Sequence, residues 1–148
     1  MKSKLPPIAE IAKIKGDAVR GKMASVVCQT CHRFGKLGYD FGPTMNGFGR
    51  TQTREVLLQA IINPSADISH GYDASEILTK DGITIHGIVI AEGDPVIIRS
   101  MAGQTQMVPK NRIKRKSKMK RSLMFSADML GLTPQTLADI VAYLQSEM

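Results

Sequence analysis

The sequence predicts a mainly helical domain that carries a small antiparallel β insertion. Apolar residues at helical spacing occur towards both ends of the chain, and short β-rich runs separated by turn residues lie between them. With 148 residues and 43% hydrophobic content, the chain suits one domain with its own core. We therefore expect a single domain over residues 1–148, in which the first and last helical regions pack on each other.

The region from Ile8 to Cys31 has a loose apolar face at helical spacing and is expected to be mostly helical. A glycine-rich loop is expected over residues 35–49. A second helix is expected to begin at Thr51 or Thr53, because threonine accepts hydrogen bonds from the first turn of a helix. It should end at Asn63-Pro64, since proline disfavours helical backbone in the residue before it.

The insertion is expected over approximately residues 73–113, as three or four antiparallel strands. Short β-rich runs cover Ile77 to Lys80, Ile83 to Ala91, Val96 to Ser100 and Gln104 to Val108. The breaks between them contain turn-forming pairs such as Asp81-Gly82, which is typical of a tight hairpin.

A basic stretch and a last helix complete the chain. Eight of the twelve residues over 110–121 are Lys or Arg and none is acidic, so we interpret this segment as an exposed basic loop. The last helix is expected to begin with Thr133 as its N-cap and Pro134 in its first position. Its buried stripe should run from Leu137 to Leu144.

Cys28-Gln29-Thr30-Cys31-His32 follows the C-x-x-C-H pattern of covalent haem attachment. Two thiols one helical turn apart can add to the two vinyl groups of one porphyrin. The imidazole of the next residue then lies beneath the iron. The pattern therefore predicts one covalently bound haem c, attached through Cys28 and Cys31, with His32 as an iron ligand.

Two other uses of a C-x-x-C pair fit the sequence less well. A structural zinc site needs four ligands, and the remaining histidines, His70 and His86, lack a suitable spacing. A thioredoxin-like redox pair lies between a strand and a helix, whereas this pair closes a predicted helix with no strand before it.

Several short stretches match one known family in order along the chain from Gly16 to Leu144. They are Gly16-Asp17, Arg20-Gly21, Cys28 to His32, Asp40 to Pro43, Thr53 to Glu55, Asn63 to Ala66, Gly71-Tyr72, Thr79 to Gly82, Ser122 to Met124 and Leu132 to Leu144. The chain thereby resembles class I cytochrome c domains, and specifically the haem-binding C-x-x-C-H domain of planctomycete and verrucomicrobial proteins. The resemblance implies the class I helical fold, with the β insertion between the second helix and a loop that carries a methionine ligand.

The resemblance also implies individual roles at the haem. Met124 follows Ser-Leu, as the second axial ligand does in the family, and the carbonyl of Pro43 would accept a hydrogen bond from His32. A Met/His ligand pair raises the reduction potential. Phe125 departs from the family, which usually has proline after the ligand methionine.

Other residues are candidates for the same site. Arg50, Arg54 and Tyr72 are candidate donors to the haem propionates, because buried carboxylates favour charge-assisted hydrogen bonds. An ordinary surface position is the alternative for each arginine. The alternatives to Met124 as distal ligand are Met119, Met129, His70 and His86.

These features predict an electron-transfer protein rather than an enzyme, with an acidic redox protein as partner. The resemblance implies a fused dehydrogenase module as the other candidate partner. The chain's net charge of +7 favours anionic partners, and the basic stretch would dock them. Nucleic acid is not expected, because no aromatic residues accompany the cations. The alternative function is a haem-based small-ligand sensor with an open or bis-His distal site.

The expected location is periplasmic or otherwise extracytoplasmic, where covalently attached haem suits a carrier. The chain has no apolar run long enough for a transmembrane segment, and its first residues do not form a signal peptide.

Overall fold

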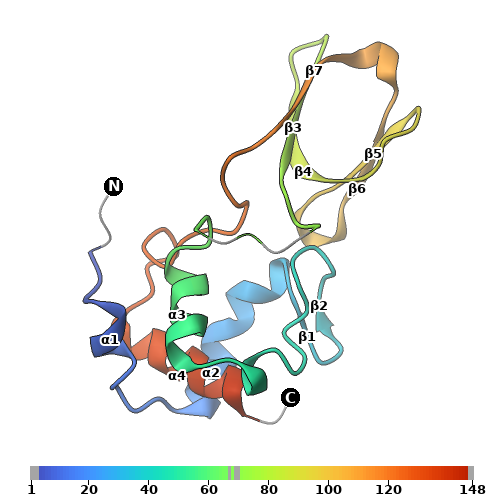
Figure 1. The fold of residues 1–148 in the computed structure, drawn as a ribbon. Coiled ribbons are helices and arrows are strands. Elements are labelled where there is room, and N and C mark those ends of the chain that lie inside the picture. Colours follow the sequence, from blue (N-terminus) through green and yellow to red (C-terminus); the bar gives the residue numbers. More distant parts are fainter. Residues whose placement is uncertain (1–3, 67, 69–70, 147–148) are drawn as a thin grey trace.

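A computed structural model of the chain describes residues 4–66, 68 and 71–146, and it divides into a helical part and a β sheet (Figure 1). The α-helices are α1 (Ile8–Ile11), α2 (Ala18–Ala24), α3 (Arg54–Ile62) and α4 (Pro134–Gln145). Short 3-10 helices are η1 (Ser25–Thr30), η2 (Gly49–Thr51), η3 (Met101–Gly103) and η4 (Lys110–Arg112). No helix in the described part of the chain is both long and apolar enough to span a membrane.

Side-chain caps begin the three longest α-helices. Thr53 accepts a hydrogen bond from the backbone of Val56 and so caps α3, while Thr133 caps α4, which has proline in its first turn. Both predicted threonine caps are therefore confirmed. The N-terminal region is less regular than expected, because α1, α2 and η1 are separate elements with Asp17 capping α2.

The helical part is organised around the crossing of α2 and α4, which confirms the expected packing of the first helical region on the last helix. Gly21 lies directly against the carbonyl of Asp139, where any side chain would overlap it. Asp139 is only 5% exposed, and the guanidinium of Arg20 contacts both of its carboxylate oxygens. A close backbone contact and a charged pair thus fix how these two helices cross.

The sheet is antiparallel, with the strand order β6-β5-β4-β3-β7. Its strands are β3 (Ser75–Thr79), β4 (Thr84–Ala91), β5 (Val96–Arg99), β6 (Thr105–Val108) and β7 (Ile113–Lys118). The Asp81-Gly82 turn joins β3 to β4 as predicted, with Gly82 at a φ of 88°. The sheet has a buried cluster of its own, formed by Ile77, Ile85, Val96, Ile98 and Val108.

The prediction of a mainly α fold is wrong, since the structure is 34% helix and 22% strand and is a mixed α and β fold. Residues 110–121 were expected to form a loop, but β7 pairs with β3 and extends the insertion to Lys118. The backbone of β7 completes an open sheet edge while its charged side chains stay in water. The glycine-rich region contains a further two-stranded hairpin, β1 (Arg33–Phe34) and β2 (Leu37–Gly38).

The two ends of the sheet segment lie side by side. The backbone N–H of Met119 donates to the carbonyl of Ala74 at 2.8 Å, so the chain leaves the helical part and returns to it at one place. A second contact joins the parts where Arg99 donates to the carbonyl of Asp40 at 2.9 Å. The sheet therefore stands beside the helices on a narrow base (Figure 1).

Candidate haem-binding site

The C-x-x-C-H motif lies at the end of η1, where the chain makes a tight turn. The backbone N–H groups of Cys31 and His32 both donate to the carbonyl of Cys28, at 3.2 and 3.0 Å. Cys28 and Cys31 are half-buried free thiols, and together with His32 they line one pocket. The turn thus brings the three motif side chains to the same wall, as covalent attachment of one haem requires.

The imidazole of His32 is held by its neighbours and is only 8% exposed. Its Nδ1 lies 2.6 Å from the carbonyl oxygen of Pro43. Because a carbonyl can only accept a hydrogen bond, Nδ1 carries the proton and the lone pair of Nε2 is left for a ligand bond. Burial also lowers the pKa of His32, partly opposed by the Pro43 carbonyl, so the ring is neutral at neutral pH.

Gly42 makes room for this ring. A Cβ at Gly42 would lie 2.5 Å from Cε1 of His32, and the backbone N–H of Gly42 donates to the carbonyl of Cys31 at 2.5 Å. The motif and the Gly42-Pro43 pair therefore form one unit, in which the second segment orients the imidazole supplied by the first.

The two thiols are not activated as nucleophiles. Burial, with a smaller contribution from Cys31, raises the pKa of Cys28 to about 11. Burial also raises the pKa of Cys31. Redox-active C-x-x-C pairs require a lowered thiol pKa, so this environment argues against a thioredoxin-like role.

The pocket is predominantly apolar and partly open to solvent. None of the described residues that line it carries a formal charge at neutral pH. Its lining includes Phe34, Phe41, Met45, Phe48, Leu57, Ala60, Ile61, Pro64, Ile68, Ile88, Ile140 and Leu144. Such a space suits a large flat apolar ligand with a few polar contacts.

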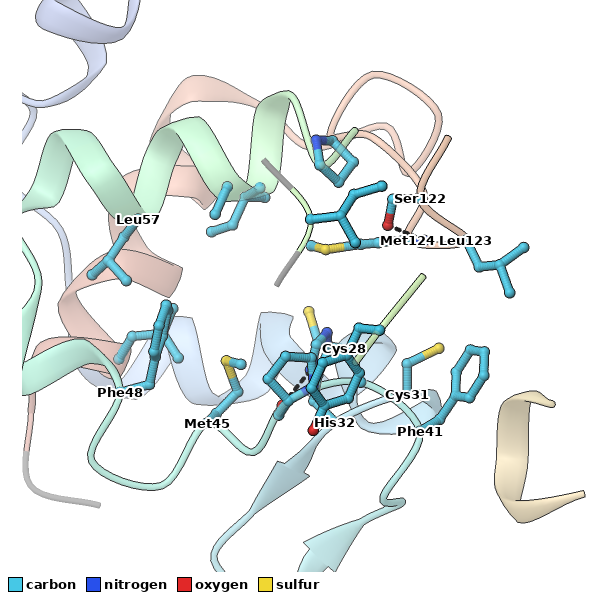
Figure 2. A pocket seen from close by; sticks show the side chains of 18 of the residues that line it. Cys28, Cys31, His32, Phe41, Met45, Phe48, Leu57, Ser122, Leu123 and Met124 are labelled. Carbon is cyan, nitrogen blue, oxygen red and sulfur yellow. Dashed lines mark hydrogen bonds between the residues drawn. The ribbon is translucent and has the colours of Figure 1, made fainter. Parts of the chain in front are cut away.

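Met124 lies on the wall that faces the motif, next to Ser122 and Leu123 (Figure 2). Its backbone N–H donates to the Oγ of Ser122 at 3.0 Å, and the N–H of Ser122 donates to the Oγ of Ser65 at 3.0 Å. These bonds tie the segment to the end of α3. Its side chain packs, half-buried, against the helical core.

The alternative distal ligands lie elsewhere or outside the described residues. Met119 and Met129 are not among the pocket-lining residues, and Met129 is 69% exposed. His86 lies on β4, with Nε2 2.8 Å from a carboxylate oxygen of Glu76. His70 lies outside the described residues.

Of the remaining candidates, Pro43 and Tyr72 line the pocket, and the two arginines do not. Arg54 instead donates to the backbone carbonyl of Ile14 at 2.5 Å, which ties α3 to the chain after α1. Arg50 lies in η2. The geometry therefore does not bring either arginine to the pocket wall.

Sequence reasoning missed several lining residues, of which Ile88 is the most informative because it comes from the sheet. Alternation along β4 indicates which side chains share a face of the strand, but no pattern in the sequence indicates what that face meets. The apolar residues Phe41, Met45 and Phe48 lie in a segment where glycine obscures any periodicity.

The residues present fit a haem. One wall supplies two neutral thiols and an oriented imidazole, the opposite wall supplies a thioether, and the space between them is apolar. Pro43 and Met124 both line this pocket, and the Pro43 carbonyl is the hydrogen-bond partner of His32. No model of a known protein family matches the chain, and no curated protein matches it.

Proposed function

We propose that this chain binds one haem covalently through Cys28 and Cys31 and transfers single electrons, with His32 and Met124 as the iron ligands. One observation carries the proposal: residues 122–124 lie on the pocket wall that faces the C-x-x-C-H turn, although the whole sheet separates them in sequence. If the C-x-x-C-H sequence occurred by chance, we would not expect it to face a methionine thioether across an apolar pocket.

The protonated thiols suit this attachment. Each S–H would add across one vinyl double bond, with the sulfur and the hydrogen bonding to its two carbons, so no oxidant is required and no group leaves. The raised pKa of Cys28 keeps that thiol protonated and resistant to disulfide exchange before attachment. Once formed, the two thioethers would hold the ligand permanently against the motif wall.

The chain's own residues also set the conditions for electron transfer. When bound, the haem supplies the iron couple that gains and loses one electron. The Pro43 carbonyl keeps the His32 ring in one orientation and increases its basicity as a ligand. The apolar lining would leave a bound haem few contacts with water, and a thioether ligand stabilises the reduced state, so we expect a comparatively high potential.

The visible spectrum tests the proposal. The protein is produced in a bacterial periplasm with haem-maturation machinery, and spectra are recorded oxidised and reduced. We expect sharp c-type bands on reduction and, in the oxidised protein, the weak far-red band of methionine bound to ferric iron. Absence of covalent haem would overturn the proposal as a whole.

Two methionine variants distinguish a ligand role of Met124 from a packing role. Met124→Leu should abolish the far-red band and lower the potential while the haem stays attached. Met129→Leu is the matched control, because Met129 is close in sequence but exposed, and it should retain the band. If Met124→Leu keeps the band, Met124 is not the ligand.

A further inference from the structure

One edge of the sheet carries a concentrated positive charge. The basic edge is defined here as β7 together with Lys120 and Arg121. Every residue of β7 except Ile113 is exposed, and β7 pairs with β3 on one side only, which leaves its other side to solvent. Four of the six cations of the basic edge, Lys114, Arg115, Lys116 and Lys118, are therefore presented on a strand, and the other two follow it directly.

Nearby acidic residues neutralise only part of this charge. Lys116 pairs with Glu92, and Arg115 lies 3.8 Å from Glu76. Within the described ranges, no carboxylate lies within ion-pair distance of Lys114, Lys118, Lys120 or Arg121. The basic edge thus keeps at least four cations available to an anionic partner.

Charged side chains on an edge strand also prevent its pairing with other chains. The opposite edge of the same sheet is β6, and its sequence Thr105-Gln106-Met107-Val108 contains no charged residue. The two edges of the sheet therefore differ in charge, and the cations are concentrated at the edge that continues into residues 122–124.

The basic edge leads directly into the candidate haem pocket. Arg121 is followed at once by Ser122, Leu123 and Met124, which line the pocket wall, and the same sheet contributes Ile88 to the lining. Figure 1 shows the chain running from β7 down to the helical part. A partner bound at the basic edge would therefore lie near the pocket wall that carries Met124.

We propose that the basic edge is the docking surface for an acidic redox protein that exchanges electrons with the pocket; the electron exchange rests on the proposed function, whereas the docking does not. Complementary charge speeds the encounter of such partners and orients them. Nucleic acid is the less favoured anion, because residues 110–121 contain no aromatic side chain to stack on bases.

A charge-reversal triple with a matched control tests this surface. Lys114→Glu, Lys118→Glu and Lys120→Glu remove unpaired cations from the basic edge. Lys13→Glu, Lys15→Glu and Lys22→Glu change the net charge equally, at exposed positions in the helical part. The haem-loaded proteins are reduced by a photoreduced flavodoxin, as an acidic protein probe, and by a neutral hydroquinone.

We expect the basic-edge triple to slow reduction by flavodoxin about tenfold or more at low ionic strength, with the difference largely lost in about 0.3 M salt. The control triple should slow it about threefold at most, and hydroquinone should reduce all the proteins equally. Equal slowing by both triples would show that net charge alone acts, and would overturn the proposal.

Binding of an acidic polymer by the protein without haem tests the docking surface independently of the proposed function. Poly-L-glutamate should bind the unmodified chain and the control triple but bind the basic-edge triple at least about tenfold more weakly. This result would support docking even if no haem attaches. Tighter binding of a DNA duplex or of anionic lipid vesicles at the same lysines would replace the acidic protein as partner.

Discussion

The helical part and the sheet have separate buried clusters, and they differ in what their packing constrains. In the helical part, Gly21 and Gly49 lie against the backbone of α4 with no room for a side chain, and Asp139 anchors the crossing. In the sheet, Gly87 lies similarly close to the carbonyl of Arg99 on the neighbouring strand, but the buried cluster consists of five aliphatic residues and the charges lie outside it. The difference indicates that close backbone contacts are more numerous in the helical part, whereas the sheet depends mainly on the burial of its aliphatic cluster.

The largest expected effect comes from a cavity in the buried cluster of the sheet, and it tests whether the sheet and the helical part unfold separately. Ile98→Ala empties a fully buried position in the sheet and should lower the free energy of unfolding of the sheet by about 4 kcal/mol. Amide exchange should accelerate in β3 to β5 and remain slow in α4. Ile97→Ala, at a half-buried position on the same strand, is the control and should cost about 1 kcal/mol. Equal acceleration in α4 would mean that both parts unfold as one unit.

A methyl group added at the helix crossing should have the next largest effect. In Gly21→Ala the new Cβ would overlap the Asp139 carbonyl, which the backbone of α4 cannot easily move, and we expect a loss of about 3 kcal/mol in urea unfolding. Gly93→Ala is the comparison change in the turn between β4 and β5, where the nearest atom to an added Cβ lies 3.9 Å away. It should cost less than about 0.5 kcal/mol. Similar losses at both glycines would contradict the difference in packing.

The smallest expected effect is a pH dependence. The Arg20 guanidinium, with help from the Asp17 backbone and Gln135, lowers the pKa of Asp139 to about 2. A lowered pKa adds stability above the ordinary value of 3.8, and that stability is lost as the pH falls through about 2. The midpoint temperature of thermal unfolding should therefore fall less steeply with decreasing pH in Asp139→Asn than in the unmodified protein. Lys116 lowers the pKa of Glu92 on the sheet as well, but that pair is exposed, so salt should weaken it.

Local signals in the sequence predicted much of the fold. Thr53 and Thr133 were identifiable as caps because capping depends on neighbouring residues alone, and the Asp81-Gly82 turn was identifiable for the same reason. The strand β7 was missed because Lys and Arg neither favour strands nor alternate with apolar residues. It forms because β3 offers an unpaired edge far away in sequence, which no local pattern reveals.

The candidate site likewise contains residues that the sequence identifies and residues that only the tertiary structure reveals. The motif fixed the identities of Cys28, Cys31 and His32, and the resemblance selected Met124 among the neighbouring methionines; all four line the pocket. The two arginines were chosen by charge alone and do not reach the pocket wall, since charge indicates what a side chain can bind but not where its element packs. The contribution of Ile88 depends on how the sheet meets the helices, which is a tertiary property.

The hydrogen bond between Met119 and Ala74 has a consequence for the entropy of chain closure. Bringing Met124 opposite Cys28 requires a loop to close, and the cost rises with the length of flexible chain in it. Once the sheet has formed, its two ends are already joined, and the insertion no longer counts toward that length. The turns at the far end of the sheet can therefore lengthen or shorten with little effect on how readily the two walls of the pocket meet.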